Sequence, residues 1–276
     1  MSLSPKPRQF TLRQLLLFVT GFALLCAAAG SAWYLFTREL ERDRLSICEG
    51  RMEQSGLAAQ EHFQHRRHFP PAYSCDAAGK PVWSWRLWLL PYLESTGTFE
   101  EVDRTAPWDG PANRVISATS IAVYQCPSGL NERTTMTDYV AVVGENTMWP
   151  GARCIRLKGP RAQTRVIPDP RGDKVPPTYV IDFGSLGDKM WIVEMADSDI
   201  NWMEPRDPSL EEVLAGAQPG AKPVIASHHP EGAVCLRVDG SVQVLSRDVD
   251  PRVLRQMLTI DPNDPSVERC QPVWPK

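Results

Sequence analysis

Two adjacent histidines, His228 and His229, are the residues of this chain that most directly suggest a reactive site. Nine residues separate His229 from an Asp239-Gly240 dipeptide, and the acidic residues Glu194 and Asp197 lie upstream. Imidazole and carboxylate groups of this kind could hold a metal ion that activates water for hydrolysis. Adjacent residues of an extended strand point to opposite faces, so both histidines could bind one ion only where the backbone turns. The candidate metal ligands are therefore His228, His229 and Asp197.

The stretch around Asp239-Gly240 also predicts a β-hairpin. The runs AVCLRV and SVQVL flank the dipeptide, whose residues tolerate the positive φ angles of a type I′ turn. A turn alone would explain Asp239 and Gly240, and the histidines would then only fix the preceding loop. The chain has no H-E-x-x-H, G-x-S-x-G, P-loop or dinucleotide-binding motif. We therefore expect a protein without enzymatic activity, with a metal-dependent hydrolase at His228 and His229 as the alternative.

Acidic and aromatic residues gather in EMADSDINWMEPRD, Glu194–Asp207. Carboxylate oxygens could collect Ca²⁺ there, but the spacing is not that of an EF-hand. We expect no cofactor, with Ca²⁺ as the one candidate ion for this loop. Trp202 either packs at a sheet edge or presents an aromatic surface. In the second case it would join Glu194, His229, Asp239 and Gly240 in a carbohydrate- or peptide-binding module.

A second histidine group consists of His62, His65 and His68, which are three residues apart. Side chains at this spacing share a helix face and could bind a metal. Arg66 and Arg67 stand among them, so the sequence predicts a solvated, positively charged helix end instead.

The oxidation state of the cysteines depends on the compartment that the chain occupies. Cys26 lies in an apolar run, and the other six allow fifteen complete pairings, among which sequence alone cannot choose. Cys48 and Cys126 are retained as one candidate disulfide pair. No two cysteines have the short spacing of a zinc knuckle or a CxxC motif, which argues against metal–thiolate chemistry. The six cysteines are Cys48, Cys75, Cys126, Cys154, Cys235 and Cys270.

An uncharged stretch near the N-terminus, Gln14–Thr37, predicts a transmembrane helix. As a helix it would be about 36 Å long, enough to cross a hydrocarbon core of about 30 Å. Lys6, Arg8 and Arg13 precede it, which favours a cytoplasmic N-terminus and an exported C-terminal part at the inner membrane. A cleaved signal peptide is the alternative, but the apolar run continues past the small residues at 27–29. We expect a retained single-pass anchor.

The 276-residue chain as a whole predicts an α+β fold. Apolar residues at helical spacing continue to about Gln64, so one helix should run from about Leu12 to there. Runs typical of strands follow, namely IAVYQC, DYVAVVG, TYVIDF, MWIVEM, AVCLRV and SVQVL, separated by long Pro-rich loops. They predict a mainly antiparallel sheet. The net charge of −3 gives no reason to expect nucleic-acid binding.

These elements predict four segments. They are a basic cytoplasmic N-terminus at 1–13, a transmembrane helix at 14–37, its extramembrane continuation at 38–68, and an exported α+β domain at 69–276. Shorter helices are expected at Trp83–Glu94, Leu210–Leu214 and Asp250–Ile260, the last with Asp250 as its N-cap.

Several motifs together resemble a known family. FTLRQLLLF resembles the start of a type IV prepilin, and CEGRMEQSGLAAQEHF is similar to the helix that follows in planctomycete pseudopilin-like proteins of unknown function. FPPAY, SWRLWLLPYLE, YQCPSG, TDYVAVVGENTMWPG and the His229 to Asp239-Gly240 spacing also match in the same order. The resemblance implies a membrane-anchored, pilin-like helix with a sheet domain, other pilin-like or secretion-platform subunits as partners, and no known reaction.

The chain departs from prepilins at two positions. Gln9 stands where a prepilin has the glycine before the cleavage point, and Gln14 stands where the mature pilin has glutamate. A neutral Gln14 cannot pair with the amino terminus of a neighbouring subunit. We therefore expect no cleavage, and a protein that begins at or near Met1.

Overall fold

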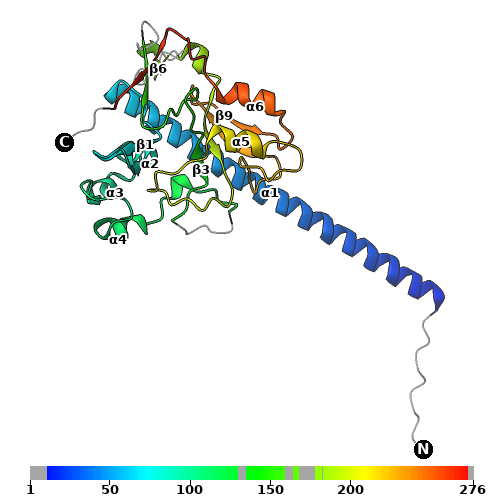
Figure 1. Cartoon of the computed structure of the whole chain (residues 1–276). Coiled ribbons are helices and arrows are strands. Elements are labelled where there is room, and N and C mark those ends of the chain that lie inside the picture. The colour runs from blue at the N-terminus through cyan, green and yellow to red at the C-terminus, as the bar shows by residue number, and fades with distance from the viewer. Residues whose placement is uncertain (1–10, 130–134, 159–163, 168–177, 182, 273–276) are drawn as a thin grey trace, which may run out of the picture. The chain divides into compact units, whose positions relative to one another are not determined.

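The computed structural model describes residues 11–129, 135–158, 164–167, 178–181 and 183–272. The chain divides into two units, Met1–Arg44 and Leu45–Lys276, and the second is called the domain below. Helices and antiparallel sheets follow one another in the order shown in Figure 1. The predicted α+β fold class is confirmed.

Helix α1, Leu12–Arg66, contains the whole apolar stretch. Thr11 caps it: the Gln14 side chain accepts a hydrogen bond from the Thr11 backbone at 3.0 Å, and the Gln14 N–H donates to Thr11 Oγ1. This reciprocal pair is a capping box, so Gln14 stabilises the start of the helix locally. Within α1, an exposed 18-residue window has a mean hydropathy of 2.1, which is apolar enough for a membrane span.

The second half of α1 contributes a buried stripe to the domain. Cys48, Met52, Ala59 and Phe63 are all at most 2% exposed, and they recur at helical spacing. Gly56 lies in the same stripe, where an added Cβ would meet a Leu236 methyl group at 3.0 Å. A side chain at this position would require Leu236 to shift by a few tenths of an ångström, so the glycine favours the close approach of α1 to the sheet. The predicted end of the helix, Gln64, is two residues short of the observed one.

Small elements follow α1. Strands β1, Tyr73–Cys75, and β2, Pro81–Ser84, form a hairpin. The predicted helix at Trp83–Glu94 is observed as α2, Trp85–Leu89, and the 3-10 turn η1, Leu90–Tyr92. The other short elements are α3, Thr96–Glu101; η2, Pro111–Asn113; α4, Arg114–Ser117; and η3, Ala122–Tyr124. The strand predicted at IAVYQC is wrong, because this segment forms η3 and buries Tyr124.

The central sheet has four antiparallel strands in the order β3-β7-β8-β9. They are β3, Tyr139–Ala141; β7, Met190–Glu194; β8, Ala233–Arg237; and β9, Val242–Leu245. All five residues of β7 are buried, as expected of a central strand covered on both faces. Its neighbours hold it in register, with Tyr139 opposite Glu194 and Cys235 opposite Val193.

The predicted hairpin joins β8 to β9, but its turn differs from the predicted type. Gly240 has a φ of 89°, whereas Asp239 is not among the described residues with positive φ. The Gly240 N–H donates to the Arg237 carbonyl, and the Asp239 side chain accepts from the Ser241 backbone. The type I′ prediction is therefore wrong. The loop has one residue more than a two-residue turn, and only its glycine, Gly240, adopts a left-handed conformation.

Other elements lie around this sheet. Strand β4, Cys154–Leu157, pairs with β10, Val267–Cys270, and β5, Thr164–Ile167, pairs with β6, Thr178–Ile181. The 3-10 turn η5, Gly184–Leu186, precedes β7. Helices α5, Leu210–Gly216, and α6, Pro251–Leu258, pack on the second hydrophobic cluster of the domain. Asp250 caps α6 as predicted. Part of the predicted Pro-rich loop at Gly159–Pro177 lies outside the described residues.

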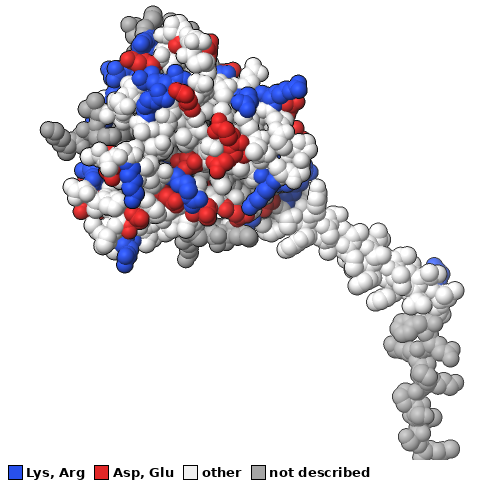
Figure 2. Space-filling view, viewed as in Figure 1, with Lys and Arg blue, Asp and Glu red and all other residues white. Residues whose placement is uncertain are grey.

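On the face shown in Figure 2, charged side chains of both signs are interspersed over the domain, whereas the apolar part of α1 shows none. This distribution agrees with the composition of each segment. The stretch at 14–37 therefore has no charged side chain that would oppose entry into a lipid phase.

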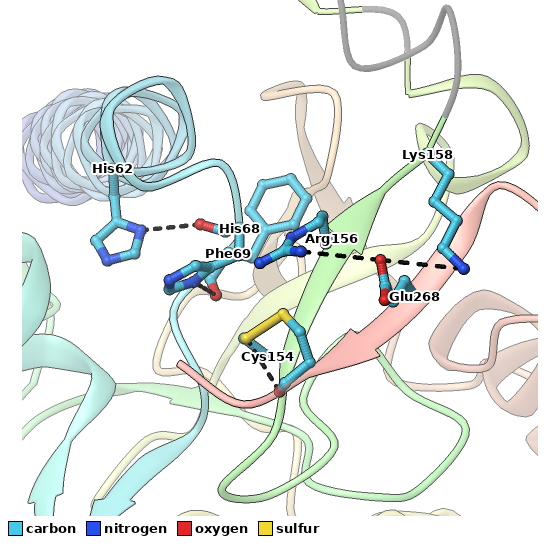
Figure 3. The surroundings of a disulfide bond; sticks show 8 residues. His62, His68, Phe69, Cys154, Arg156, Lys158 and Glu268 are labelled. Carbon is cyan, nitrogen blue, oxygen red and sulfur yellow. Dashed lines mark hydrogen bonds and ion pairs between the residues drawn. A yellow bond between two sulfur atoms is a disulfide. The ribbon is translucent and has the colours of Figure 1, made fainter. Parts of the chain in front are cut away.

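A disulfide bridge joins Cys154 in β4 to Cys270 in β10, with 5.0 Å between their Cα atoms (Figure 3). The two cysteines are directly opposite each other in this strand pair, so the bridge joins residues that strand pairing already holds side by side. Disulfides of this kind persist in oxidising compartments. On the same two strands, Glu268 Oε2 lies 4.0 Å from Arg156 Nη1 and 4.0 Å from Lys158 Nζ.

The histidine group at the end of α1 is only partly solvated. His62 and His68 are 2% and 3% exposed, and their rings meet edge to face, while His65 is exposed. The prediction of a solvated, charged end is therefore wrong for His62 and His68. Burial lowers the pKa of His62 to about 3, with a smaller effect from the neighbouring charge of His68. His62 is thus neutral in the folded domain.

This buried histidine should make stability depend on pH. The unfolded state binds a proton below about pH 6.5 and the folded state does not, so stability present above that pH is lost on acidification. Between pH 7 and pH 5 we expect His62 to account for a loss of about 2 kcal/mol. Urea unfolding of the wild type and of His62→Gln at both pH values measures it, because only the wild type should show this additional loss. His65→Gln is the exposed control, and an equal loss in the wild type and His62→Gln would contradict the prediction.

Candidate functional site

Four buried side chains from distant parts of the chain converge beside the end of β7. They are Cys48 of α1, Cys126 after η3, Glu194 at the end of β7, and His229 before β8. Their sulfur, carboxylate oxygen and imidazole nitrogen atoms all lie within 4.8 Å of one another. Each residue is at most 1% exposed, so the group is closed to solvent. These four residues are called the buried cluster below.

Backbone pairing brings His229 to Glu194. Ala226 donates a hydrogen bond to the Glu194 carbonyl at 3.1 Å, which places the loop before β8 along the end of β7. The Ser227 hydroxyl then accepts from the His229 N–H, and Arg247 donates to the His229 carbonyl at 2.9 Å. The loop is therefore held at several points, and the His229 ring points inward.

Separate contacts bring the two cysteines together. Arg51, one turn after Cys48 on α1, donates to the Gln125 carbonyl at 2.8 Å. The N–H of Cys126 donates to the Asp138 carboxylate at 2.6 Å. These hydrogen bonds hold α1 and the loop after η3 next to each other. Each of the two segments carries one of the thiols.

Direct contacts link the members of the buried cluster. Cys126 Sγ lies 3.3 Å from His229 Nε2, and Cys48 Sγ lies 3.9 Å from Glu194 Oε1. The hydroxyl of Tyr139, a buried residue of β3, lies 2.8 Å from Cys48 Sγ. The other carboxylate oxygen of Glu194 accepts a hydrogen bond from the Val234 N–H at 2.9 Å.

The acid–base properties of these groups are strongly perturbed. Hydrogen bonds from Cys126 first, and then from His229 and Tyr139, lower the pKa of Cys48 to about 6 despite its burial. The hydrogen bond to Cys48, followed by burial, raises the pKa of Cys126. Burial and the charge of Cys48 raise the pKa of Glu194. The protonation of the two thiols and of the carboxylate is therefore linked through their mutual contacts.

Three kinds of chemistry use such a set of groups. Thiolates, imidazole and carboxylate are ligands of tetrahedral Zn²⁺. Two neighbouring thiols can also form a disulfide. A cysteine beside a histidine can act as a nucleophile, but that role requires access for a substrate. The burial of all four side chains disfavours catalysis and leaves metal binding or a disulfide.

The structure separates the two adjacent histidines. His228 points outward, and its Nε2 lies 3.1 Å from Asp197 Oδ1, in a pair whose Asp197 side chain is 60% exposed. His229 points into the domain toward Glu194. The candidate ligands His228 and Asp197 therefore form a surface pair, apart from the buried cluster that includes His229.

The other residues predicted for a binding site are also dispersed. Asp239 and Gly240 form the β8–β9 turn, where Asp239 accepts from the Ser241 backbone and hydroxyl. Trp202 is 1% exposed and donates its indole N–H to the Thr119 carbonyl at 2.8 Å. Trp202 is thus a core residue, and it offers no aromatic surface to a ligand.

Several acidic side chains of the loop considered for Ca²⁺ form ion pairs with arginines. Arg206 pairs with Glu204 at 2.7 Å and with Asp199 at 2.9 Å. Arg86 pairs with Asp207 at 2.6 Å in the interior. These three carboxylates already have a cationic partner, and Glu194 of the same stretch belongs to the buried cluster.

Sequence reasoning missed the participation of Cys48 and Cys126 in a site with His229 and Glu194. The sequence predicts only a candidate disulfide for these two cysteines, and the lack of a short motif argues against metal–thiolate binding. The structure brings the two thiols together but leaves both free, and it forms the bridge between Cys154 and Cys270. The placement of Cys48 on the buried stripe of α1 was the one signal that it faces the domain interior.

Comparisons with known proteins address the identity of the chain. No curated protein and no solved structure matches it. A family model described as "Protein of unknown function (DUF1559)" matches residues 42–150 and 137–252, a region that includes all four residues of the buried cluster. Because these matches cover most of the sequence, the chain belongs to this family of proteins of unknown function, DUF1559.

Proposed function

We propose that this protein is a membrane-anchored, pseudopilin-like structural or interaction component of a secretion or cell-surface assembly. The observation that carries the proposal is the exposed, uncharged segment at 14–37, which belongs to the same helix as the buried stripe of the domain. An anchor of this composition holds its domain at a membrane without further modification.

Two features support an exported location for the domain. Lys6, Arg8 and Arg13 precede the apolar segment, and positive residues favour the cytoplasmic side of the inner membrane. The Cys154–Cys270 bridge suits an oxidising compartment. On this basis the protein is a single-pass inner-membrane protein with its C-terminal domain outside the cytoplasm.

The exposed apolar helix favours a role in interaction with lipid or other proteins over a role in catalysis. Leu24, Leu25 and Phe36 are 72%, 70% and 56% exposed, so these side chains are available to lipid or to another apolar helix. The partners proposed here are further copies of this chain or other pilin-like or secretion-platform subunits.

Photo-crosslinking in the native membrane tests this proposal. A photo-reactive amino acid at Leu25 should give multimers of the full-length chain, or adducts with other proteins that carry an N-terminal apolar helix. The matched control is the same amino acid at Val115, which is 78% exposed on the domain and should give fewer such products. Monomers alone from Leu25 would contradict an assembly role.

A wash of the same membranes at alkaline pH tests the anchor separately. The full-length chain should remain in the membrane pellet, since a helix of this hydropathy does not leave the bilayer with peripheral proteins. Recovery of the uncleaved chain in the supernatant would contradict the anchor itself.

A further inference from the structure

We infer that the buried cluster is a structural Zn²⁺ site, in which Cys48, Cys126, Glu194 and His229 supply the four ligands. This inference does not depend on the proposed membrane assembly, because all four residues lie within the domain. It assigns a specific chemical role to the buried groups that have no part in that assembly.

The distances in the buried cluster suit tetrahedral coordination. With Zn–S bonds of about 2.3 Å and Zn–N or Zn–O bonds of about 2.0–2.1 Å, the ligand atoms of a tetrahedron lie roughly 3.3–3.8 Å apart. Cys126 Sγ and His229 Nε2 are 3.3 Å apart, and Cys48 Sγ and Glu194 Oε1 are 3.9 Å apart. All other ligand pairs are within 4.8 Å, so side-chain adjustments of about 1 Å bring the set into zinc geometry.

The groups around the ligands also suit a metal centre. Metal ligands are oriented by hydrogen bonds from a second layer of residues. The Tyr139 hydroxyl is 2.8 Å from Cys48 Sγ, and the Val234 N–H donates to Oε2 of Glu194, which leaves Oε1 for the metal. The Ser128 hydroxyl lies 3.5 Å from His229 Nδ1, on the opposite side of the ring from the nitrogen that faces Cys126. His229 would therefore bind through Nε2.

The ligand types select among metal ions. Ca²⁺ and Mg²⁺ prefer sites made only of oxygen atoms, whereas two thiolates with an imidazole favour Zn²⁺. Two sulfur ligands and a carboxylate are costly to bury as anions, and a divalent cation among them offsets this cost. The observed set thus points to zinc in place of the Ca²⁺ suggested by the acidic loop.

Burial indicates that the ion is structural. A catalytic zinc keeps one position open for water or substrate, whereas a structural zinc has four protein ligands. Here four ligands are available and each is at most 1% exposed. Cys48 and Glu194 are 146 residues apart in the sequence, and Cys126 and His229 are 103 apart. One ion would therefore connect α1, the loop after η3, β7 and the loop before β8.

Metal analysis of the full-length protein, purified in detergent without chelators or reducing agents, tests the inference. We expect about one zinc per chain, and substitution by Co²⁺ should give the visible absorption of a tetrahedral thiolate site. Cys126→Ser and His229→Gln should each bind zinc at least about tenfold more weakly. Cys235→Ala is the matched control, since Cys235 is also a buried free thiol but lies outside the buried cluster, and this variant should retain the metal.

The wild-type protein provides a test that does not depend on the folding of variants. Removal of zinc by a chelator should lower Tm by about 10 °C and expose two further thiols to alkylation, and added Zn²⁺ should reverse both changes. Three results would overturn the inference: a protein that neither contains nor takes up zinc, variants Cys126→Ser and His229→Gln that keep it fully, or a Cys48–Cys126 disulfide in the protein as isolated.

Discussion

Replacing Asp207 by leucine is expected to lower the free energy of unfolding of the domain by about 3–5 kcal/mol, because it leaves the guanidinium of Arg86 buried without a counter-charge. The two side chains are 0% and 1% exposed and meet at 2.6 Å. Asp207 also accepts hydrogen bonds from the backbone of Ala141 and the indole of Trp85, and Arg86 donates two to the Tyr139 carbonyl. The pair therefore joins α2 to β3 and to the loop before α5.

Urea unfolding of the full-length chain in detergent measures this loss. The control is Glu145→Gln, which breaks the exposed pair with Arg153 and should cost at most about 1 kcal/mol. The double variant Arg86→Met/Asp207→Leu should recover part of the loss, since it removes both charges. An Asp207→Leu variant as stable as Glu145→Gln would show that Arg86 finds water or another partner.

Replacing Trp149 by alanine should also destabilise the domain by about 3–5 kcal/mol, through the loss of buried area and the cavity left behind. The Trp149 ring packs between two other indoles, with its centroid 5.2 Å from that of Trp85 and 5.7 Å from that of Trp191. Its indole N–H donates to the Trp191 carbonyl in β7. The three tryptophans connect α2, the loop after β3, and the central strand.

The same urea experiment, followed by far-ultraviolet circular dichroism, measures the effect. Trp149→Phe keeps an aromatic ring and should lose less than Trp149→Ala. Trp33→Ala alters an indole that is 68% exposed in the apolar segment, so it should leave unfolding of the domain unchanged. Equal stability of Trp149→Ala and Trp33→Ala would contradict the assigned role of this core.

The architecture follows well from local sequence signals. Uninterrupted helical spacing predicted α1 to within two residues of its end, and short β-branched runs predicted β3, β7, β8 and β9. Tertiary packing overrode these signals elsewhere. IAVYQC has the composition of a strand, yet it forms η3, because burial of Tyr124 against the Arg86 carbonyl outweighs its strand propensity.

The buried cluster could not be predicted in the same way. Its four residues are far apart in the sequence, and no two of them lie within a few positions of each other, as the ligands of known zinc motifs do. Cys48 and His229 become neighbours only after α1 packs on the sheet and the loop before β8 pairs with the end of β7. A single sequence gives the types of such residues, whereas their proximity depends on long-range contacts.

The bridge between Cys154 and Cys270 encloses β7, β8 and β9 together with Glu194 and His229. These two cysteines are 116 residues apart in the sequence, and a protease that cuts once between them releases no fragment, since both pieces stay covalently attached. Exposed loops are common sites of such cuts. The domain can be nicked and remain whole, and only reduction would separate the parts.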